Sequence, residues 1–563
     1  MKFSLLLVIS FITLLQSQTG YNVALYGQMN KSWTNPAASN YSEVWGWTDS
    51  VKHREYAFIG GPLGTIIVDI TTQPVKIVDT LIGPTSNNSY KYHEFRTYKN
   101  YLFIGSEGTD INLNAGIQIV DLSTLPDSVS LKKVFVWTDT TNFVTNATRK
   151  YYRAHTLSIE NNFLYVNGGD FGGTRIMDIS DPLNPKQAGS YGKGSTPYVH
   201  DAVIRNDTLY AAAINEGRMD IVDLREKRHL TQSDAASIVS KTATIPEGRT
   251  HQVWLSDNGK YAFVCTEAPG TTPYAYSLHV YDISNRTNPI QIAKWISDPG
   301  KSIHNAFVQG DLLFIAYYTD GLRILDISDP SVPIEVGFYK TYNGSASVLF
   351  AGAWGVYPYF PSGNVVVSDM NTGLYALTVN RKKGGRISGR VRDAVTQQLL
   401  SGVDVTVQEM GRKYTSDVNG AFIYGSAEGK HTITFSKAGY ISKTETLYTK
   451  PGVLDSVNIS LSSSASSVIG QVNSYPAAFA LAQNFPNPFN PATTISFSIT
   501  ERNFTTLSVS NALGQSVTTL LRQHLEAGEY RTTFNAATLP SGMYYYTLTS
   551  GNNSITKRMV LIK

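Results

Sequence analysis

The sequence predicts an all-β protein, a seven-bladed β-propeller followed by two small β-sandwich domains. A strand motif that usually ends in Asp recurs seven times in the first 380 residues, and two later segments alternate apolar and polar residues between tight turns. The 563 residues include 34 Tyr and 45 Gly but only 16% charged residues, a composition that suits strands and turns. The length indicates two to four domains.

The N-terminal residues MKFSLLLVISFITLLQSQTG predict a secretory signal peptide over residues 1–19. One Lys precedes an apolar run over residues 5–15, and small and polar residues follow it. This run is too short to cross a membrane as a permanent helix, and no later apolar stretch of about 20 residues exists. Cys265 is the single cysteine and excludes an internal disulfide. We therefore expect an exported protein with no transmembrane segment.

Residues 21–380 contain the repeats that predict the propeller. Seven copies of an alternating strand are spaced about 45 to 60 residues apart, a period typical of propeller blades. Each copy follows another strand-like run, and several precede a turn that contains Asp-Pro. The copies are GTIIVDI (64–70), GIQIVDL (116–122), GTRIMDI (173–179), GRMDIVDL (217–224), SLHVYDI (277–283), GLRILDI (321–327) and GLYALTV (373–379).

The N-terminal part of this region predicts how the ring closes. After the seventh repeat the chain leaves through a basic linker, residues 380–384, so the seventh blade lacks its final strand. Residues 22–29, NVALYGQM, resemble the final strands QAGSYGK and EVGFYKT of other blades. We predict that residues 22–29 pair with the seventh blade and close the ring.

Five histidines lie shortly before the second strand of five repeats, early on the predicted first strand. Because the first strands of a propeller converge on the central channel, we predict an arc of histidines at one channel mouth. The residues that follow the histidines are polar, whereas the first and seventh blades carry Glu43, Trp45 and Trp354. The predicted binding residues at this mouth are His93, Glu94, His155, His200, Asp201, His251, Gln252, His304, Asn305, Trp45 and Trp354.

Two interpretations of the arc are open. In the first, each histidine bonds to a backbone carbonyl of the neighbouring blade and is structural. In the second, the arc binds a divalent metal, zinc or manganese, through His155, His200, His251 and His304. The same residues with the tryptophans also suit a sugar or another small polar ligand. The histidines lie on separate strands, so no ligand spacing such as HExxH decides between these interpretations.

The sequence lacks several motifs that would indicate particular classes of enzyme. It contains no GxSxG elbow, no Walker loop and no GxGxxG between a strand and a helix. A formal net charge of +4 without long basic runs gives nucleic-acid binding no electrostatic support. Cys265 lies in a strand-like run and is interpreted as a core residue. We expect a binding protein; the alternative is a metal-dependent extracellular enzyme, a polysaccharide lyase or hydrolase that uses the histidine arc.

The ordered motifs of the first 380 residues resemble a known family. The VDI-type copies are similar to LVIVD repeats. The series SEVWGW, HEF, AHT, HDA, THQVWLS, IHNAF, GLRILDISDP and AWGVYPYFPSG resembles the choice-of-anchor B family of exported propeller proteins. The resemblance implies a propeller joined to a surface-anchoring tail, and it carries no activity with it.

Residues 385–462 predict the first sandwich. Apolar and polar residues alternate in VDVTV and HTITF, with turns at DVNG and AEGK. The order SGRV, SGVDVTV, TSDVNGAF and FSKAGY resembles the carboxypeptidase regulatory-like family. That resemblance implies a non-catalytic spacer, with carbohydrate or cell-surface binding as the alternative. Residues 463–480 are rich in small residues and predict a flexible linker.

Residues 481–563 predict the second sandwich. Prolines at 486, 488 and 491 precede the strand TISFSI, after which strands and turns alternate. NFPNPFNP, a central GQ, LPSGMYYYTL and the basic end KRMVLIK resemble the type IX secretion C-terminal sorting domain. The resemblance implies recognition by the type IX outer-membrane machinery. The cargo is then released or attached to the outer cell surface.

Overall fold

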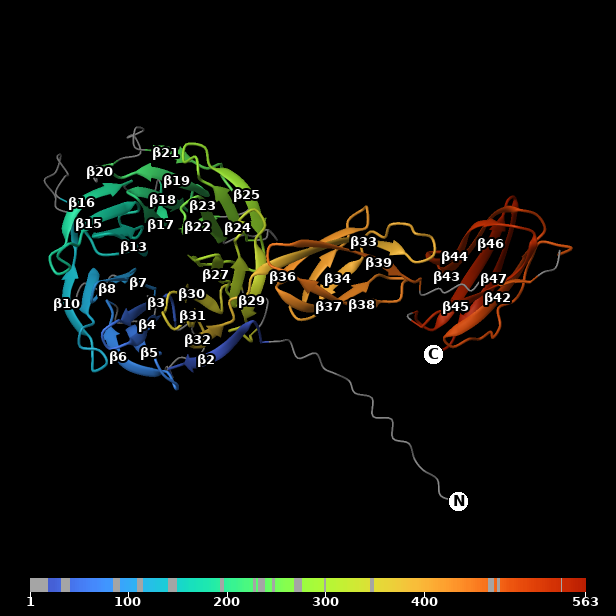
Figure 1. The fold of residues 1–563 in the computed structure, drawn as a ribbon, viewed down its shortest axis with the longest axis horizontal. Helices are drawn as coiled ribbons and strands as arrows, with labels where there is room; N and C mark the ends of the chain where they lie inside the picture. Colours follow the sequence, from blue (N-terminus) through green and yellow to red (C-terminus); the bar gives the residue numbers. More distant parts are fainter. Residues whose placement is uncertain are drawn as a thin grey trace, which may run out of the picture. The chain divides into compact units, whose positions relative to one another are not determined.

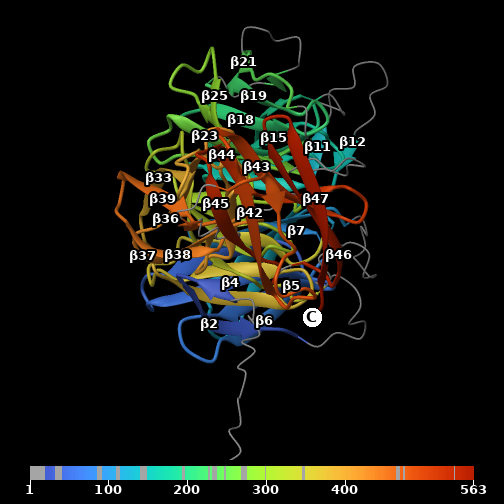
Figure 2. The same cartoon turned by 90° about the vertical axis from the view of Figure 1, so that its right-hand side faces the viewer.

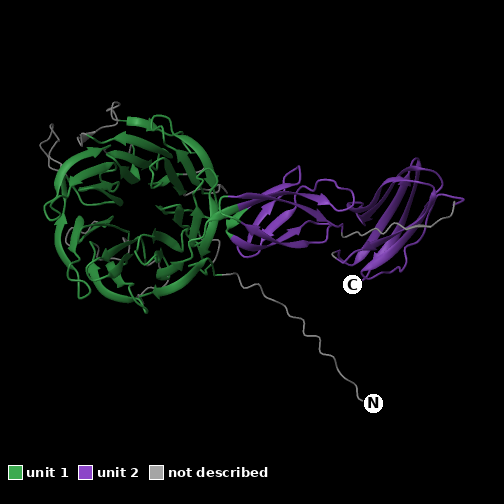
Figure 3. Ribbon diagram, in the orientation of Figure 1, with its two compact units in different colours: residues 1–385, 425–428, 450–452 green, residues 386–424, 429–449, 453–563 purple. Residues whose placement is uncertain are grey.

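The computed structural model divides into two compact units, coloured separately in Figure 3. The first comprises residues 1–385, 425–428 and 450–452, and the second comprises residues 386–424, 429–449 and 453–563. The structure describes residues 19–31, 41–84, 92–108, 115–139, 149–192, 197–225, 229–230, 238–245, 249–267, 276–297, 300–344, 349–463, 470–472, 476–537 and 539–563. The predicted signal peptide, apart from Thr19, lies outside these ranges.

The described residues form strands and turns and no helix, which confirms the all-β prediction. None of these residues therefore supplies a helix long and apolar enough to cross a membrane. The described residues of the first unit form seven sheets of four or five strands, here called sheets one to seven in chain order.

The first four sheets have the following strands. Sheet one consists of β3 (Val44–Asp49), β4 (Arg54–Gly61), β5 (Gly64–Asp69) and β6 (Lys76–Ile82). Sheet two consists of β7 (His93–Tyr98), β8 (Tyr101–Ser106), β9 (Ile117–Asp121) and β10 (Ser130–Phe135). Sheet three consists of β13 (Thr156–Glu160), β14 (Phe163–Asn167), β15 (Thr174–Asp178), β16 (Lys186–Tyr191) and β20 (His229–Leu230). Sheet four consists of β17 (Val199–Arg205), β18 (Thr208–Ala213), β19 (Arg218–Asp223) and β21 (Ile238–Lys241).

The other three sheets follow the same order. Sheet five consists of β22 (Arg249–Leu255), β23 (Tyr261–Glu267), β24 (Leu278–Asp282) and β25 (Ile290–Trp295). Sheet six consists of β26 (Ala306–Gln309), β27 (Leu312–Ala316), β28 (Leu322–Asp326), β29 (Ile334–Tyr339) and β1 (Gly20–Tyr21). Sheet seven consists of β30 (Ala353–Tyr357), β31 (Val365–Asp369), β32 (Gly373–Val379) and β2 (Val23–Met29). A separate pair joins β11 (Trp137–Asp139) and β12 (Arg149–Tyr151).

Each sequence repeat forms the third strand of one sheet. The glycine before this strand allows a tight approach of the neighbouring backbone: at Gly321, φ is +76° and a Cβ atom would lie 2.2 Å from the carbonyl oxygen of Tyr339. Any other residue at this position would be strained by both its backbone conformation and this contact. The Asp that ends the strand fixes the following turn, as in sheet six, where the backbone N–H of Ser328 donates to Asp326 (2.8 Å).

The sheets of the first unit are arranged in a ring with their first strands toward its centre (Figure 1). These first strands contact one another in a closed cycle, β3, β7, β13, β17, β22, β26, β30 and back to β3. Apolar side chains from adjacent sheets share cores; for example, Ile176 of β15 and Ile204 of β17 belong to one cluster. Each sheet thereby buries faces that it would expose if it stood alone.

The predicted closure of the ring is confirmed. β2 pairs antiparallel with β32, from Val23 opposite Val379 to Met29 opposite Leu374. Both Val23 and Met29 are buried. The preceding strand β1 pairs with β29 of sheet six, so ten consecutive residues join the last two sheets. Cys265 is fully buried on β23, in agreement with its interpretation as a core residue.

The second unit contains four sheets. Residues 384–461 form one sheet of β36 (Ala421–Ala427), β33 (Gly384–Asp393) and β39 (Leu454–Leu461), and another of β35 (Arg412–Thr415), β34 (Asp404–Val407), β37 (Gly429–Ser436) and β38 (Lys443–Thr449). Residues 470–561 form one sheet of β40 (Gly470–Val472), β45 (Gly528–Asn535), β42 (Ala492–Ile499) and β41 (Ala480–Leu481), and another of β44 (Ser516–Leu525), β43 (Asn503–Asn511), β46 (Gly542–Ser550) and β47 (Asn553–Leu561).

The last two sheets contribute to a common core. Phe497 and Tyr530 from one sheet and Leu507 and Tyr546 from the other belong to the same buried cluster. In Figure 2, β42 and β45 lie side by side, as do β46 and β47. The strand β40 lies inside the predicted flexible linker and pairs with β45, so the linker prediction does not hold for these three residues.

Candidate functional site

The innermost strands begin with a β-bulge in most sheets of the first unit. The register of β17 shifts at His200, that of β22 at His251 and that of β30 at Trp354. In sheet six both His304 and Asn305 bond to the backbone of one residue, Ala316. A bulge bends the strand and re-aims the extra side chain. The same irregularity therefore recurs at the same end of the innermost strands, and the histidines occupy it.

The side chains at these positions form a continuous series of ring contacts. The ring centroids of His155 and His200 lie 3.9 Å apart, those of His200 and His251 4.2 Å, and those of His251 and His304 4.3 Å. Trp354 continues the series, because its ring centroid lies 4.2 Å from that of His304. We call these five residues the histidine arc. Trp354 takes the place of a histidine in sheet seven.

His93 occupies a different environment. The register of β7 runs from His93 to Tyr98 without a shift, so no bulge re-aims its side chain. Its ring is parallel to that of Phe95 and lies beside Gly60 and Gly83 of sheet one. The preceding residue, Tyr92, instead stacks on Trp354 with ring centroids 5.3 Å apart. Tyr92 rather than His93 therefore extends the arc in sheet two.

Part of the arc connects adjacent sheets. Nδ1 of His200 hydrogen-bonds to the backbone carbonyl of His251 on the next sheet (3.0 Å), and the hydroxyl of Thr156 donates to the carbonyl of His200 (2.8 Å). The corresponding carbonyls of His304 and Trp354 raise the pKa of His251 and of His304, respectively, against the larger effect of burial. These contacts support the structural interpretation for one side of the imidazoles. Nε2, on the opposite side of the ring, makes other contacts in His200 and His251.

One end of the arc is a carboxylate–imidazole pair. Nδ1 of His155 lies 2.7 Å from Oε1 of Glu107, and Nε2 of His155 lies 2.6 Å from Nε2 of His200. Burial lowers the pKa of His155, but the hydrogen bond and charge of Glu107 outweigh it, so this pKa is raised. The pKa of His200 is held well below its usual value by burial and by His155. His155 is therefore the proton donor of the pair and His200 the acceptor.

The other end contains a second carboxylate. Oε2 of Glu267 lies 3.6 Å from Nε2 of His251, and the hydroxyl of Tyr318 donates a hydrogen bond to Oε1 of Glu267. One ligand atom from each of His251, Glu267 and His304 lies within 4.8 Å of the other two. Both histidines are buried, which lowers their pKa, so both are neutral at pH 7. Among the His, Cys, Asp and Glu side chains of the described residues, His251, Glu267 and His304 lie close enough together to surround one metal ion.

A second layer of polar residues lies one residue further along the innermost strands. Glu43, Glu94 and Asp201 are buried there with the guanidinium of Arg96, whose Nη1 lies 2.6 Å from Oε1 of Glu94. Asn305 donates to Oε2 of Glu43 (2.6 Å). We call Glu43, Glu94, Asp201 and Arg96 the buried charge layer. Within this layer the three buried carboxylates have one cation, Arg96, so their negative charges are not fully compensated.

The pKa values of this layer follow from that imbalance. Burial raises the pKa of Glu94 to about 7 and that of Asp201 to about 6. Burial, together with the charge of Glu94, raises the pKa of Glu43 well above its usual value. Gln252, the next polar residue of the series, accepts a hydrogen bond from the backbone N–H of Ala306 at 2.6 Å and so links sheets five and six.

Trp45 does not lie in the arc. Its ring contacts Phe307 and Tyr357, with ring centroids 5.8 and 5.0 Å away, and Arg96 lies 4.1 Å above it. Since Trp45 lies two residues after Glu43 on β3, it is on the far side of the buried charge layer. The predicted pairing of Trp45 with Trp354 at one mouth is therefore corrected to Trp354 with Tyr92.

Sequence reasoning missed several residues that complete the site: Tyr92, Arg96, Glu107 and Tyr318. Glu267 is the last residue of β23. A signal for the two carboxylates does exist. Glu107 follows the second strand of sheet two in YLFIGSE, and Glu267 ends the second strand of sheet five in YAFVCTE.

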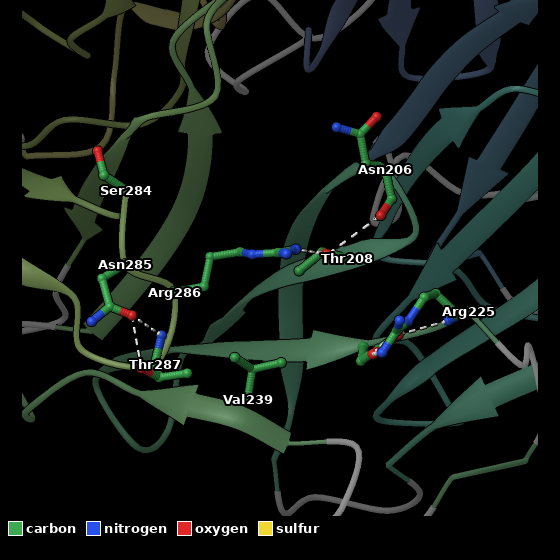
Figure 4. Close-up of a pocket in the computed structure, with 9 residues that line it drawn as sticks. Asn206, Thr208, Arg225, Val239, Ser284, Asn285, Arg286 and Thr287 are labelled. Atoms are coloured by element: carbon green, nitrogen blue, oxygen red, sulfur yellow. Dashed lines mark hydrogen bonds and ion pairs between the residues drawn. The ribbon is translucent and has the colours of Figure 1, made fainter.

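A separate cavity of about 450 Å³ lies away from the arc (Figure 4). It is lined by Thr208, Arg225 and Arg286 among other polar residues, at the ends of β18 and β19 and in the turn after β24. Arg286 donates to the hydroxyl of Thr208 (2.6 Å), and Arg225 pairs with Asp223. None of the predicted site residues lines it.

Three family descriptions match parts of the chain. The LVIVD repeat matches residues 153–192, 247–294 and 302–341, each of which covers one sheet of the first unit. The CarboxypepD_reg-like domain matches residues 387–472, and the secretion system C-terminal sorting domain matches residues 483–563. The resemblances to these three families are thereby confirmed. The sorting domain identifies the chain as a cargo that the type IX system secretes to the outer cell surface.

Solved structures similar to this chain have low sequence identity. Raptor from Chaetomium thermophilum is 10% identical, with a TM-score of 0.43, and the match covers 64% of this chain and 30% of that one. The C-terminal WD40 domain of Sif2 is 11% identical, with a TM-score of 0.38 and coverage of 63% and 100%. A putative 6-phosphogluconolactonase from Bacteroides uniformis is 12% identical, with a TM-score of 0.37 and coverage of 68% and 99%. No curated protein sequence matches the chain.

Proposed function

We propose that this protein is a secreted surface-binding protein whose first unit is a seven-bladed β-propeller that binds a small carbohydrate-like ligand at the histidine arc. The seven sheets correspond to seven blades, and the four sheets of the second unit correspond to two sandwich domains. In this architecture the regulatory-like domain is a spacer and the sorting domain is the export signal. The arrangement agrees with the choice-of-anchor B resemblance, in which a propeller is combined with a surface-anchoring tail.

The observation that carries the ligand proposal is the aromatic pair at the open end of the arc. Tyr92 is 36% exposed and stacks on Trp354, while the neighbouring imidazoles and carboxylates are largely buried. Aromatic faces next to hydrogen-bonding groups suit a ligand with apolar faces and many hydroxyls, such as a sugar. The charges of Glu107 and Glu267 both raise the pKa of Tyr92, after burial, so both carboxylates lie near its hydroxyl.

A binding role is better supported than the alternative of a polysaccharide lyase or hydrolase. Glu107 accepts a hydrogen bond from His155, and Glu267 accepts one from Tyr318. They are held as hydrogen-bond acceptors and are suited to orient a ligand. The proposal therefore assigns recognition and no turnover to this site.

A glycan array incubated with the full mature chain tests the proposal. We expect the wild-type chain to bind a restricted set of glycans, and Tyr92→Ala to lose most of this binding because one stacking face is removed. Tyr448→Ala, which removes an exposed tyrosine of the second unit, is the matched control and keeps wild-type binding. Absence of glycan binding by the folded wild-type chain, or equal binding by Tyr92→Ala, contradicts the proposed ligand class.

A further inference from the structure

We infer that His251, Glu267 and His304 form a zinc site within the histidine arc. The inference rests on the proposed function, which places the ligand at the histidine arc. It adds a divalent cation to the same site. It differs from the set expected from sequence, because Glu267 enters the site while His155 and His200 form a pair with Glu107.

The geometry brings three donors together from three different segments. His251 occupies the bulge of β22, Glu267 ends the neighbouring strand β23, and His304 precedes β26 in the next sheet. The donor atoms lie within 4.8 Å of one another, and Nε2 of His251 lies 3.6 Å from Oε2 of Glu267. Ligands about 2.0–2.1 Å from a tetrahedral zinc ion lie roughly 3.3 Å from each other, so small side-chain movements complete the site.

The donor chemistry selects the metal. Two imidazoles and one carboxylate are a recurrent protein ligand set for zinc, with a fourth position left for water or another ligand. Nitrogen donors make the site a poor match for calcium or magnesium, which prefer oxygen. Since the histidines and Glu267 come from a ring held by several sheets, the donors are already positioned before the ion binds.

A contact with Tyr318 holds the carboxylate of Glu267 in place. The hydroxyl of Tyr318 donates to Oε1 of Glu267, while Oε2 faces His251. Tyr318 also contacts the ring of His304, with ring centroids 5.3 Å apart, so one side chain supports two of the three donors. Partners of this kind tune metal affinity and are the expected companions of a metal site.

Zinc binding to the full mature chain, expressed without a polyhistidine tag and stripped of metal, tests the inference. Isothermal titration with ZnCl2 alone is expected to show one ion per chain whose binding Glu267→Gln weakens at least about 100-fold. Tyr318→Phe, which keeps the ring but removes the donor to Glu267, is expected to weaken binding about 10-fold. Zinc also raises the melting temperature of the wild-type chain, and Glu267→Gln removes this rise.

Asp127→Asn is the control, because it removes an exposed carboxylate of the first unit without touching the three donors. It is expected to bind zinc like the wild-type chain. Absence of zinc binding by the folded wild-type chain, or equal affinity in Glu267→Gln, overturns the inference. A loss in Asp127→Asn as large as that in Glu267→Gln overturns it as well, because the loss is then not specific to the donor carboxylate. Since no glycan is present, failure of the glycan array leaves this result unaffected.

Discussion

At the scale of single residues, the first unit places ionisable groups in two successive layers along its innermost strands. The histidine arc is partly open, and the pKa of His155 is raised by Glu107 whereas burial lowers the pKa of His200, His251 and His304. The buried charge layer beneath it contains three carboxylates and the single guanidinium of Arg96. Burial disfavours the charged form of the histidines and the carboxylates of these layers, and a close partner of opposite charge opposes that effect.

The state of Glu94 predicts a pH dependence of stability. Its pKa is about 7 in the folded protein against a usual value of 4.5, so the folded state binds this proton more tightly and stability falls as pH rises from about 4.5 to 7. Glu94→Gln lacks this loss, so we expect the stability of the variant relative to the wild type to be higher at pH 8 than at pH 5, by up to about 3 kcal/mol. Urea unfolding at both pH values measures it.

Asp127→Asn is the control for that experiment, since Asp127 is exposed. Its effect on stability is expected to be small and the same at both pH values. A stability difference between Glu94→Gln and the wild type that is equal at pH 5 and pH 8 contradicts the prediction.

A second residue-scale prediction concerns His155. Without the hydrogen bond and charge of Glu107, the lowering effect of burial has less opposition, so Glu107→Gln is expected to lower the pKa of His155. An NMR titration of the chain with 13C-labelled histidine measures this pKa. The pKa of His251 provides the internal reference, because its carboxylate neighbour is Glu267. An unchanged pKa of His155 in the variant shows that the Glu107 contact is absent in solution.

At the scale of elements, local sequence patterns predicted the strands but not the bulges. The third strands are visible because their alternation and terminal Asp are local features, and they appear where expected in all seven sheets. A bulge depends on which residue of a neighbouring strand is opposite, so single-strand patterns do not reveal it. For this reason His93 and His200 look equivalent in YHEF and VHDA, yet only His200 joins the arc.

Pairing between distant segments also explains what was missed at the site. Glu107 follows one second strand, Glu267 ends another, and Tyr92 precedes a first strand, so only the assembled ring brings them to the histidines. The polar residues after the histidines were expected at the channel mouth; Glu94 and Asp201 lie in the buried charge layer, and Asn305 donates a hydrogen bond to Glu43 of that layer. Trp45 was misplaced because its distance along β3 was not taken into account.

The closing strand gives an element-scale prediction. A chain that starts at residue 30 lacks β2 and leaves β32 unpaired along one edge, so we expect the melting temperature of the first unit to fall by more than 10 °C, since several kcal/mol of pairing and burial are lost. A chain that starts at residue 22 keeps β2 and is the control, with a smaller loss. Calorimetry compares the two. Equal melting temperatures of the two truncated chains contradict the closing role of β2.

At the scale of the whole molecule, the ring of sheets with its candidate site and the export signal belong to separate units. The arc lies entirely in the first unit, whereas the sorting domain occupies residues 483–563 of the second. This organisation was predictable, because each segment carries ordered motifs of its own. The ligand was not predictable, because it depends on side chains brought together from six different sheets.

The sorting domain predicts the route of the protein. Deletion of residues 483–563 is expected to stop the protein from crossing the outer membrane, because the type IX machinery no longer recognises it. Deletion of residues 387–472 is the control and is expected to preserve secretion. Cell fractionation with protease accessibility of intact cells measures both. A protein without residues 483–563 that still reaches the cell surface contradicts the assignment.

The pairing of β2 with β32 has a consequence for the order of folding. These strands are separated by about 350 residues of chain, so joining them costs roughly 5 kcal/mol of loop-closure entropy if the intervening sheets are unfolded. Once sheets one to six have stacked, the ends are already near each other and most of that cost has been met. We therefore expect the N-terminal strand to join last.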